Sequence, residues 1–329
     1  MSNVETRPAR AEVQPLPENI RSAQPGEGVG YRIELAWGRF RRWYLRRLRP
    51  NYVRQMATLR RGSVSGCPCE VLDPRDLKYF RNRCDCDWAT EDDPFAWRER
   101  LPWARWGLAE LQLLGWPLLG LTVVLAAFYW PLAIVPAVLL GLVLYFFRDP
   151  QRTVPQEPGV VVAPADGRVV EVVRIADKDE IGGPAVRIGI FLSIFNVHLN
   201  RAPSNCRVVW LRYCRGKFLN AMRPQSAREN ESMWIGLEQA EPPYRRMIVR
   251  QISGAIARRI VCDLRPGQTL SRGQRFGMIK LGSRTELLLP EGATLRVEVA
   301  PGDRIKAGSS VVARYASSAE PGQSRAAGQ

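Results

Sequence analysis

Histidine is almost absent from this sequence, because His198 is the only one in 329 residues. Any chemical step that needs an imidazole as acid or base therefore has one candidate. No apolar core of a secretory signal follows the first methionine, so we expect no export. The chain also has no base-reading motif of nucleic-acid-binding proteins. Its net charge of +16 therefore favours the phosphates of lipid head groups, and we expect no nucleic-acid partner.

Acidic residues are scarce between Arg32 and Arg61, where Glu34 is the only one beside ten arginines. Aromatic residues are interleaved with these arginines, at Trp37, Phe40, Trp43, Tyr44 and Tyr52. The segment has helical content and can lie on an anionic membrane with its arginines toward the phosphates. The alternative is an ordinary solvated helix face. Residues 1–30, rich in proline, glutamate and glycine, are predicted to be a disordered tail.

No charged residue occurs from Leu111 to Phe147. One membrane-spanning helix needs about 20 apolar residues, so this run is too long for one helix and barely long enough for two. Pro117, Pro131 and Pro136 divide it, which favours a tight or re-entrant hydrophobic hairpin over residues 111–147. Arginines flank both ends, which places both ends on the cytoplasmic side of a cell membrane. The alternative is a pair of helices buried in a core.

Seven cysteines leave at least one without a disulfide partner, and the cytosolic setting disfavours disulfides. Four of them form two CxC pairs in the basic extension over residues 31–110, at Cys67, Cys69, Cys84 and Cys86. Four thiolates at this spacing are candidate ligands for a structural zinc ion, or for an iron–sulfur cluster. Reduced thiols without metal and a redox pair are the alternatives, because CxC is shorter than the CxxC of most zinc sites.

After Asp149 the pattern changes to short β-branched runs separated by glycine, proline and aspartate. This rhythm is typical of a mostly β (α+β) domain, barrel-like or sandwich-like, over residues 148–316. The expected strands cover residues 160–162, 168–175, 185–193, 207–213, 244–252, 274–281, 286–289, 294–299 and 311–315. Residues 255–260 are expected to form a short helix or bend, and residues 317–329 a loose tail.

Three weak local signals lie in this domain. Gly282-Ser283 falls where one expected strand turns into the next, although most Gly-Ser pairs are ordinary turns. Asp166 lies in the turn sequence PADG, where aspartate usually bonds its own backbone. His198 follows a strand, and a lone histidine is more often a packed residue than a catalyst.

Together these signals fall within seven ordered motifs that resemble the phosphatidylserine decarboxylase family. The motifs are FFRDPQR (146–152), PADGRV (164–169), IFLSIFNVHLNRAP (190–203), GKFLNA (216–221), ENES (229–232), QISGAIARRIVC (251–262) and FGMIKLGSR (276–284). The GSR ending is similar to the shorter bacterial and archaeal branch. The chain departs from the family pattern at Leu281, Glu286 and Cys206, none of which belongs to the expected chemistry. The resemblance covers roughly residues 111–301.

The resemblance implies a proenzyme that cuts itself between Gly282 and Ser283 and turns Ser283 into a pyruvoyl group. His198 would be the base that activates Ser283, oriented by Asp166 as in a Ser-His-Asp set. Glycine suits the acyl position because it tolerates a strained backbone and close approach. The pyruvoyl ketone would form a Schiff base with phosphatidylserine and accept electrons as carbon dioxide leaves, giving phosphatidylethanolamine. His198 is also the candidate acid that protonates the product carbon.

The resemblance further implies two chains after cleavage, a β chain of residues 1–282 and an α chain of residues 283–329, and we expect a homo-oligomer. The expected partners are phosphatidylserine and an anionic membrane. Two alternatives stay open: decarboxylation of another serine-headed lipid, such as an ether lipid, and a membrane-tethered β domain that binds lipid and never cleaves.

Overall fold

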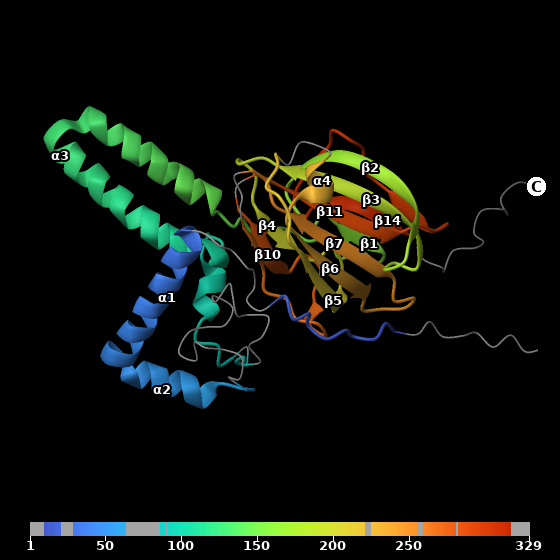
Figure 1. Ribbon diagram of the computed structural model, residues 1–329, viewed down its shortest axis with the longest axis horizontal. Coiled ribbons are helices and arrows are strands. Elements are labelled where there is room, and N and C mark those ends of the chain that lie inside the picture. The colour runs from blue at the N-terminus through green and yellow to red at the C-terminus, as the bar shows by residue number, and fades with distance from the viewer. Residues whose placement is uncertain are drawn as a thin grey trace, which may run out of the picture.

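The structure is a computed structural model that describes residues 10–20, 29–63, 86–89, 91–220, 225–255, 259–280 and 282–316. A β domain forms one half of the molecule, and long helices project from one side of it (Figure 1). The expectation of a mostly β domain preceded by apolar helices is therefore confirmed.

The strands alternate with short turns along the chain. They are β1 (Val160–Val162), β2 (Gly167–Lys178), β3 (Gly183–Leu192), β4 (Leu199–Arg201), β5 (Cys206–Cys214), β6 (Ser232–Gln239), β7 (Arg246–Ile252), β8 (Ile260–Cys262), β9 (Thr269–Leu270), β10 (Arg275–Ile279), β11 (Ser283–Pro290), β12 (Leu295–Val297), β13 (Arg304–Ile305) and β14 (Val311–Tyr315). The one-turn helix α4 (Ser226–Glu229) lies between β5 and β6. Valine and isoleucine are frequent in β2, β3 and β7, because their branched side chains pack well on a pleated surface.

The main sheet has eight strands in the order β13-β2-β3-β11-β7-β6-β5-β9. Its strands are antiparallel, and β11 lies between β3 and β7, with Ser283 opposite Leu192 and Arg284 opposite Ile252. Two three-stranded sheets, β1-β14-β12 and β4-β10-β8, complete the domain. Consecutive strands β10 and β11 therefore belong to different sheets. The turn between them, which contains Gly282, connects two sheets.

The apolar run forms the helix α3 (Leu108–Phe146), which bends back on itself at Tyr129 (Figure 1). Tyr129 has the non-helical angles φ −157° and ψ 88°. The bend has a local cause, because Pro131 has no N–H to bond the fourth residue before it and its ring crowds that carbonyl. The two arms contact each other, since a methyl group on Gly115 would lie 3.8 Å from Leu140 Cδ1. The chain thus forms the expected apolar hairpin, which we call the α3 hairpin.

The surface of the α3 hairpin is apolar and exposed, unlike the surface of a core helix. Only 11% of its most apolar stretch is buried. An arm of about 20 residues is roughly 30 Å long, close to the thickness of the hydrocarbon layer of a bilayer. By length and composition α3 is able to cross a membrane.

The base of the α3 hairpin is packed into the β domain. The short helices η2 (Ala96–Arg100) and η3 (Arg105–Gly107) lead into it. The Ala104 N–H donates to the Phe147 carbonyl at 2.7 Å, and the Asp149 N–H donates to the Pro102 carbonyl at 2.8 Å. A buried apolar cluster joins both ends of the hairpin to β4, β8 and β10; it consists of Ala104, Trp106, Phe146, Phe147, Val197, Leu199, Val261 and Met278.

Two further helices, α1 (Val29–Leu48) and α2 (Pro50–Leu59), lie beside the hairpin rather than on the β domain (Figure 1). Helix α1 carries much of the arginine-rich segment. Its aromatic rings follow one another along the helix, with ring centroids 5.6 Å apart between Trp37 and Phe40 and 5.9 Å apart between Phe40 and Trp43. Phe40 and Trp43 are more than half exposed. The face is thus apolar, aromatic and solvent-facing in an otherwise basic helix.

The prediction of a disordered tail over residues 1–30 is wrong for residues 10–20. The Gln14 N–H donates to the Val209 carbonyl of β5 at 2.9 Å, and the Asn19 amide donates to the Tyr213 carbonyl at 3.0 Å. Ile20 is 1% exposed within the main core. A few apolar residues in a polar, proline-rich stretch bury enough surface to hold this segment on a strand that is already formed.

Two smaller expectations stay predictions. Most of the expected bend, at residues 256–258, and the expected loose tail over residues 317–329 lie outside the described residues.

Candidate active site

The turn between β10 and β11 places Gly282 and Ser283 in contrasting positions. Gly282 has φ +68°, in the left-handed region that side chains with a Cβ avoid. Ser283 is the first residue of β11 and is fully buried. Its hydroxyl oxygen has no hydrogen-bond partner within the described chain. A buried hydroxyl usually has a partner, so this one invites a chemical explanation.

His198 reaches this turn from the loop between β3 and β4. Its Nδ1 atom lies 2.9 Å from the Asn196 carbonyl, and its Nε2 atom lies 3.2 Å from the Gly282 amide nitrogen. A carbonyl can only accept, so Nδ1 carries the proton, and Nε2 accepts from the Gly282 N–H. The unprotonated nitrogen of the imidazole therefore faces the peptide segment that the sequence predicts to be cut.

The surroundings of His198 keep it neutral. The side chain is fully buried, and the Phe146 ring lies against it with centroids 4.6 Å apart. Burial lowers the pKa of His198 from its ordinary value of 6.5 to about 4; the bond to Asn196 opposes this shift and the Arg148 charge adds to it. At neutral pH the ring is thus uncharged, and Nε2, which accepts from the Gly282 N–H, is the nitrogen that can take up a proton.

The loop that carries His198 is held by its own polar side chains. Asn196 accepts from the Ser193 N–H and from the Ser193 hydroxyl, both at 2.8 Å. This closed turn fixes the Asn196 carbonyl that selects the tautomer of His198. The sequence reasoning missed Asn196; the spacing Ser193-x-x-Asn196 ahead of the histidine is the signal that would have found it.

Asp166 does not orient His198 as the Ser-His-Asp expectation required. Both ring nitrogens of His198 are bonded to backbone groups. The Asp166 carboxylate instead accepts from Arg152 at 2.7 Å and from the Ala307 N–H at 2.7 Å. Burial raises its pKa above the ordinary value, with both partners opposing the rise. The expected contact is corrected because nearer donors satisfy Asp166.

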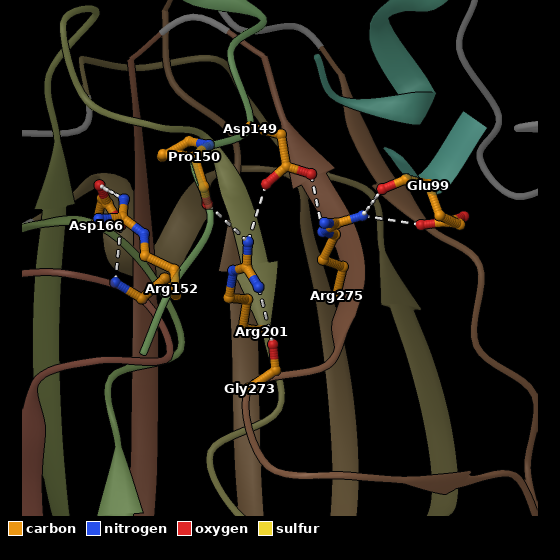
Figure 2. A network of polar contacts seen from close by, with 9 residues as sticks. Glu99, Asp149, Pro150, Arg152, Asp166, Arg201, Gly273 and Arg275 are labelled. Carbon is orange, nitrogen blue, oxygen red and sulfur yellow. Dashed lines mark hydrogen bonds and ion pairs between the residues drawn. The ribbon is translucent and has the colours of Figure 1, made fainter. Parts of the chain in front are cut away.

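Asp166 instead stands at one end of a row of arginines and carboxylates at this end of the domain (Figure 2). Arg201 bonds Asp149 at 2.9 Å and the Gly273 carbonyl at 3.1 Å. Arg275 bridges Asp149 and Glu99, at 2.8 Å from each carboxylate. Burial raises the pKa of Asp149, although Arg275, Arg201 and Arg152 oppose the rise. The row links the segment after the hairpin to β4 and β10, the strands beside the site.

The α3 hairpin contacts the site through both of its ends. At its start, Glu110 pairs with Lys280, two residues before Gly282. At its end, Phe146 packs on His198. The apolar helices and the candidate scissile turn are therefore parts of one packed unit.

Comparisons with known proteins assign this arrangement to a family. The family model for phosphatidylserine decarboxylase matches residues 139–313. A phosphatidylserine decarboxylase proenzyme of Rhodopirellula baltica is 51% identical over 239 residues, which are 73% of this chain and 99% of the relative. This chain belongs to the phosphatidylserine decarboxylase family. Proenzymes of the same name from Symbiobacterium thermophilum (44% identical; 61% of this chain and 93% of the relative) and Chlorobium chlorochromatii (46%; 54% and 81%) also match.

The region that matches the phosphatidylserine decarboxylase family contains every candidate residue of the site, from Asp166 to Ser283. It also begins inside the second arm of the α3 hairpin. Helices α1 and α2 lie outside it, so the family gives them no role.

Three buried polar side chains behind the candidate scissile turn were not foreseen. The Asn200 amide donates to the Thr285 hydroxyl at 3.1 Å, and the Gln251 amide donates to the Asn200 side-chain oxygen at 2.8 Å. All three are fully buried. They connect β4, β7 and β11 around Ser283. The position of Asn200 and Gln251 inside the family motifs was the available signal, whereas Thr285 directly follows the last motif.

The zinc prediction is not tested by the structure. Cys67, Cys69 and Cys84 lie outside the described residues, and Cys86 is buried. Among the residues that the structure describes, no group of three or more His, Cys, Asp or Glu side chains could hold a metal ion. Zinc binding by the two CxC pairs stays a prediction.

Proposed function

We propose that this chain is a phosphatidylserine decarboxylase that cuts its own backbone between Gly282 and Ser283. The observation that carries the proposal is the arrangement at this bond. A buried serine hydroxyl without a partner adjoins a left-handed glycine, and the unprotonated nitrogen of the only histidine lies 3.2 Å from that glycine's nitrogen. Family membership supports the same activity.

Self-cleavage begins as Ser283 Oγ attacks the carbonyl carbon of Gly282. His198 accepts the hydroxyl proton and returns it to the Ser283 nitrogen as the carbon–nitrogen bond breaks, so an ester replaces the amide. Loss of the Cα proton of Ser283 then breaks the Cβ–Oγ bond and releases the Gly282 carboxylate. The remaining dehydroalanine exchanges its nitrogen for the oxygen of water, ammonia leaves, and a pyruvoyl group caps residue 283.

The residues present fit a pyruvoyl group at this position, because Ser283 supplies its carbons and its hydroxyl is engaged by no other described side chain. The ketone supplies an electron sink for the carboxylate carbon as carbon dioxide leaves. His198 can return a proton to the substrate carbon once Nε2 has taken one up, and its buried ring keeps bulk water from that carbon. In this proposal Asp166 acts through Arg152 and the Ala307 backbone, as a positioning residue of the site.

Cleavage also opens the way to the site. No atom outside its neighbours lies within 4 Å of where a Gly282 side chain would be, so the turn is open on that side. Once the bond is cut, Gly282 is a chain end that can move away, whereas Ser283 stays paired in β11. The same cleavage that produces the pyruvoyl group would then also give the lipid head group access to it.

The α3 hairpin is proposed to hold the protein on the cytoplasmic side of the cell membrane. Its exposed apolar surface suits hydrocarbon, and Arg105 and Arg148 lie at its two ends. Helix α1 adds arginines and exposed rings that suit an anionic lipid surface. A lipid substrate would thus be met where it resides.

The deciding experiment is the intact mass of detergent-extracted protein beside a Ser283→Ala variant. Two chains divided after Gly282, with the smaller one carrying a ketone that reacts with hydrazine and both absent from the variant, are the expected result. A folded wild-type protein that stays uncut would overturn the proposal and leave a lipid-binding β domain. If cleavage occurs, turnover of serine lipids with ester and ether tails identifies the substrate class.

A further inference from the structure

Arg148 has an unusual position directly after the α3 hairpin. One guanidinium nitrogen donates to the Tyr145 carbonyl at 2.7 Å, and another donates to the Phe195 carbonyl at 2.8 Å. The guanidinium carbon also lies 3.7 Å from the centre of the Tyr145 ring. Arg148 therefore ties the end of the membrane hairpin to the loop that carries His198.

The other arginines around this end of the domain are bonded to carboxylates. Arg152 is paired with Asp166, Arg201 with Asp149, and Arg275 with both Asp149 and Glu99 (Figure 2). Within the described chain Arg148 forms no ion pair, and both of its hydrogen bonds go to neutral carbonyls. Within the described chain no carboxylate contacts this charge directly; the charge acts at longer range on Asp166, where it opposes the rise of the pKa.

Arg148 also keeps donors for another partner. A guanidinium has five N–H groups, and the two carbonyls use two of them. Its planar fork matches two oxygens of a phosphate better than an ammonium group does. The side chain is half-buried, so it is held in place and still accessible.

Arg148 lies where the phosphate of a phospholipid would lie while the amine of its head group reacts at residue 283. The Arg148 charge acts on His198, whose pKa it lowers, so the two side chains are electrostatic neighbours. Ile194, Phe195 and Tyr145 are exposed around it and form an apolar rim. In a serine phospholipid the phosphodiester is only a few bonds from the amine, on the side of the acyl chains. An arginine between the reacting centre and the membrane hairpin occupies the corresponding position.

We propose that Arg148 binds the phosphodiester of the phospholipid substrate and so selects phosphorylated over phosphate-free amines. This inference rests on the proposed function, since it assumes a ketone at residue 283. Arg148 would let the site distinguish a lipid head group from a free amino acid that reaches the ketone.

The test uses full-length, self-cleaved protein and two amines of similar length. One is sn-glycero-3-phosphoethanolamine, which has the phosphodiester, and the other is 2-(2-aminoethoxy)ethanol, which lacks it. Cyanoborohydride traps each amine on the small chain, and the mass increment is measured against amine concentration. The variants are Arg148→Gln and Arg148→Lys. Arg272→Gln is the matched control, because Arg272 also donates to two backbone carbonyls, of Pro155 and Glu157.

In the wild type and in Arg272→Gln we expect the phosphodiester amine to reach half-maximal trapping at a lower concentration than the phosphate-free amine. In Arg148→Gln this advantage should fall at least about tenfold, as expected for a lost hydrogen bond between charged groups, while the phosphate-free amine is trapped as before. Arg148→Lys should lose part of the advantage, and it carries the test if Arg148→Gln does not cleave. Equal weakening of both amines, or of neither, would overturn the inference. Absence of cleavage and trapping in the wild type would overturn the proposed function and this inference with it.

Discussion

The two sides of the Gly282–Ser283 bond differ in how firmly the fold holds them. Ser283 is buried in β11, where it pairs with Leu192 of β3, and β11 has a neighbouring strand on each side. Gly282 lies in a turn between two sheets, in a left-handed conformation with open space beside it. Ser283, the proposed nucleophile, is held in the main sheet, whereas the Gly282 carbonyl belongs to the turn between two sheets, which we call the movable side.

This difference indicates which side of the bond adjusts during cleavage. The pairing of Ser283 in β11 holds its backbone, so we expect the backbone adjustment that brings the Gly282 carbonyl and Ser283 Oγ together to occur in the turn. His198 contacts the movable side, at the Gly282 N–H. Substitutions on the fixed side should therefore remove the chemistry, and substitutions on the movable side should change its rate.

The largest effect is expected from His198→Gln. Glutamine can keep a hydrogen bond near Gly282, but it cannot accept a proton, so we expect cleavage to slow by about 10²-fold or more. The measurement is the fraction of cut chain against time after synthesis, with circular dichroism to confirm folding. Cleavage at the wild-type rate in a folded His198→Gln protein would show that the fixed serine needs no base from this histidine.

The next effect concerns pH and the stability of the uncut protein. Because burial lowers the pKa of His198 to about 4, the unfolded chain binds a proton between about pH 6.5 and pH 4 that the folded chain does not. Stability should therefore fall with falling pH in this window, by up to roughly 1.4 kcal/mol per pH unit.

Buried acids whose pKa is raised, such as Asp149 and Asp166, act with the opposite sign. The measurement is accordingly a difference: urea unfolding of Ser283→Ala with and without His198→Gln, at pH 7, 5.5 and 4.5. A destabilisation by acid that is the same in both proteins would mean that His198 is not the group responsible.

A smaller effect is expected from Gly282→Ala on the movable side. A Cβ would meet no atom there, so the cost comes from the left-handed backbone alone, about 1 kcal/mol. We expect cleavage to slow by up to about tenfold, because the strained turn relaxes away from the geometry for attack. Gly292→Ala is the control, since a Cβ there also meets nothing and no positive φ is required. Equal cleavage rates of Gly282→Ala and Gly292→Ala would show that the conformation of Gly282 does not set the rate.

The smallest effect should follow Lys280→Met. Lys280 pairs with Glu110 at the base of the α3 hairpin, and both side chains are mostly buried. Losing the pair loosens the movable side without touching Ser283 or His198, so we expect cleavage to slow a few-fold. Lys217→Met is the control, because the pair of Lys217 with Glu229 is largely exposed and such pairs contribute little. If Lys280→Met cleaves at the same rate as the control, the contact of Lys280 with the α3 hairpin does not affect cleavage.

Much of the fold follows from residue patterns. The valine runs at 160–162 and 311–315 are strands with those bounds, and the prolines of the apolar run do bend it into a hairpin. Strand β4 was missed because its sequence LNR is mostly polar, and strand β8 was missed because its first residue was assigned to the expected helix or bend over residues 255–260. Strand β6 was missed because its glycine and glutamate interrupt the apolar pattern of SMWIGLEQ, and pairing with β5 and β7 decides its conformation.

The site was predictable in its members and less so in its contacts. Gly282 and His198 do meet, and Ser283 is the next residue in the chain, whereas a contact between Ser283 Oγ and His198 stays a prediction. The partner of His198 is a backbone carbonyl, which every residue has, so the spacing Ser193-x-x-Asn196 marks a turn but does not show that its carbonyl takes the place of Asp166. Asp166 bonds Arg152, a nearby arginine that sequence alone ranks no higher than any other. Side-chain pairing of this kind depends on the packed geometry.

The position of β11 has a consequence for the durability of the cut protein. The small chain begins with β11, which pairs with β3 and β7, and it continues through β13 and β14, which pair with β2 and β1. Folding of the uncut chain closes these pairs within one molecule. After cleavage the same strand pairs join two separate chains. Refolding then becomes a second-order reaction, and at low protein concentration the two chains would fail to reassociate. The mature protein would persist because its unfolding is slow, and a denatured sample should not regain its structure by a simple return to native buffer.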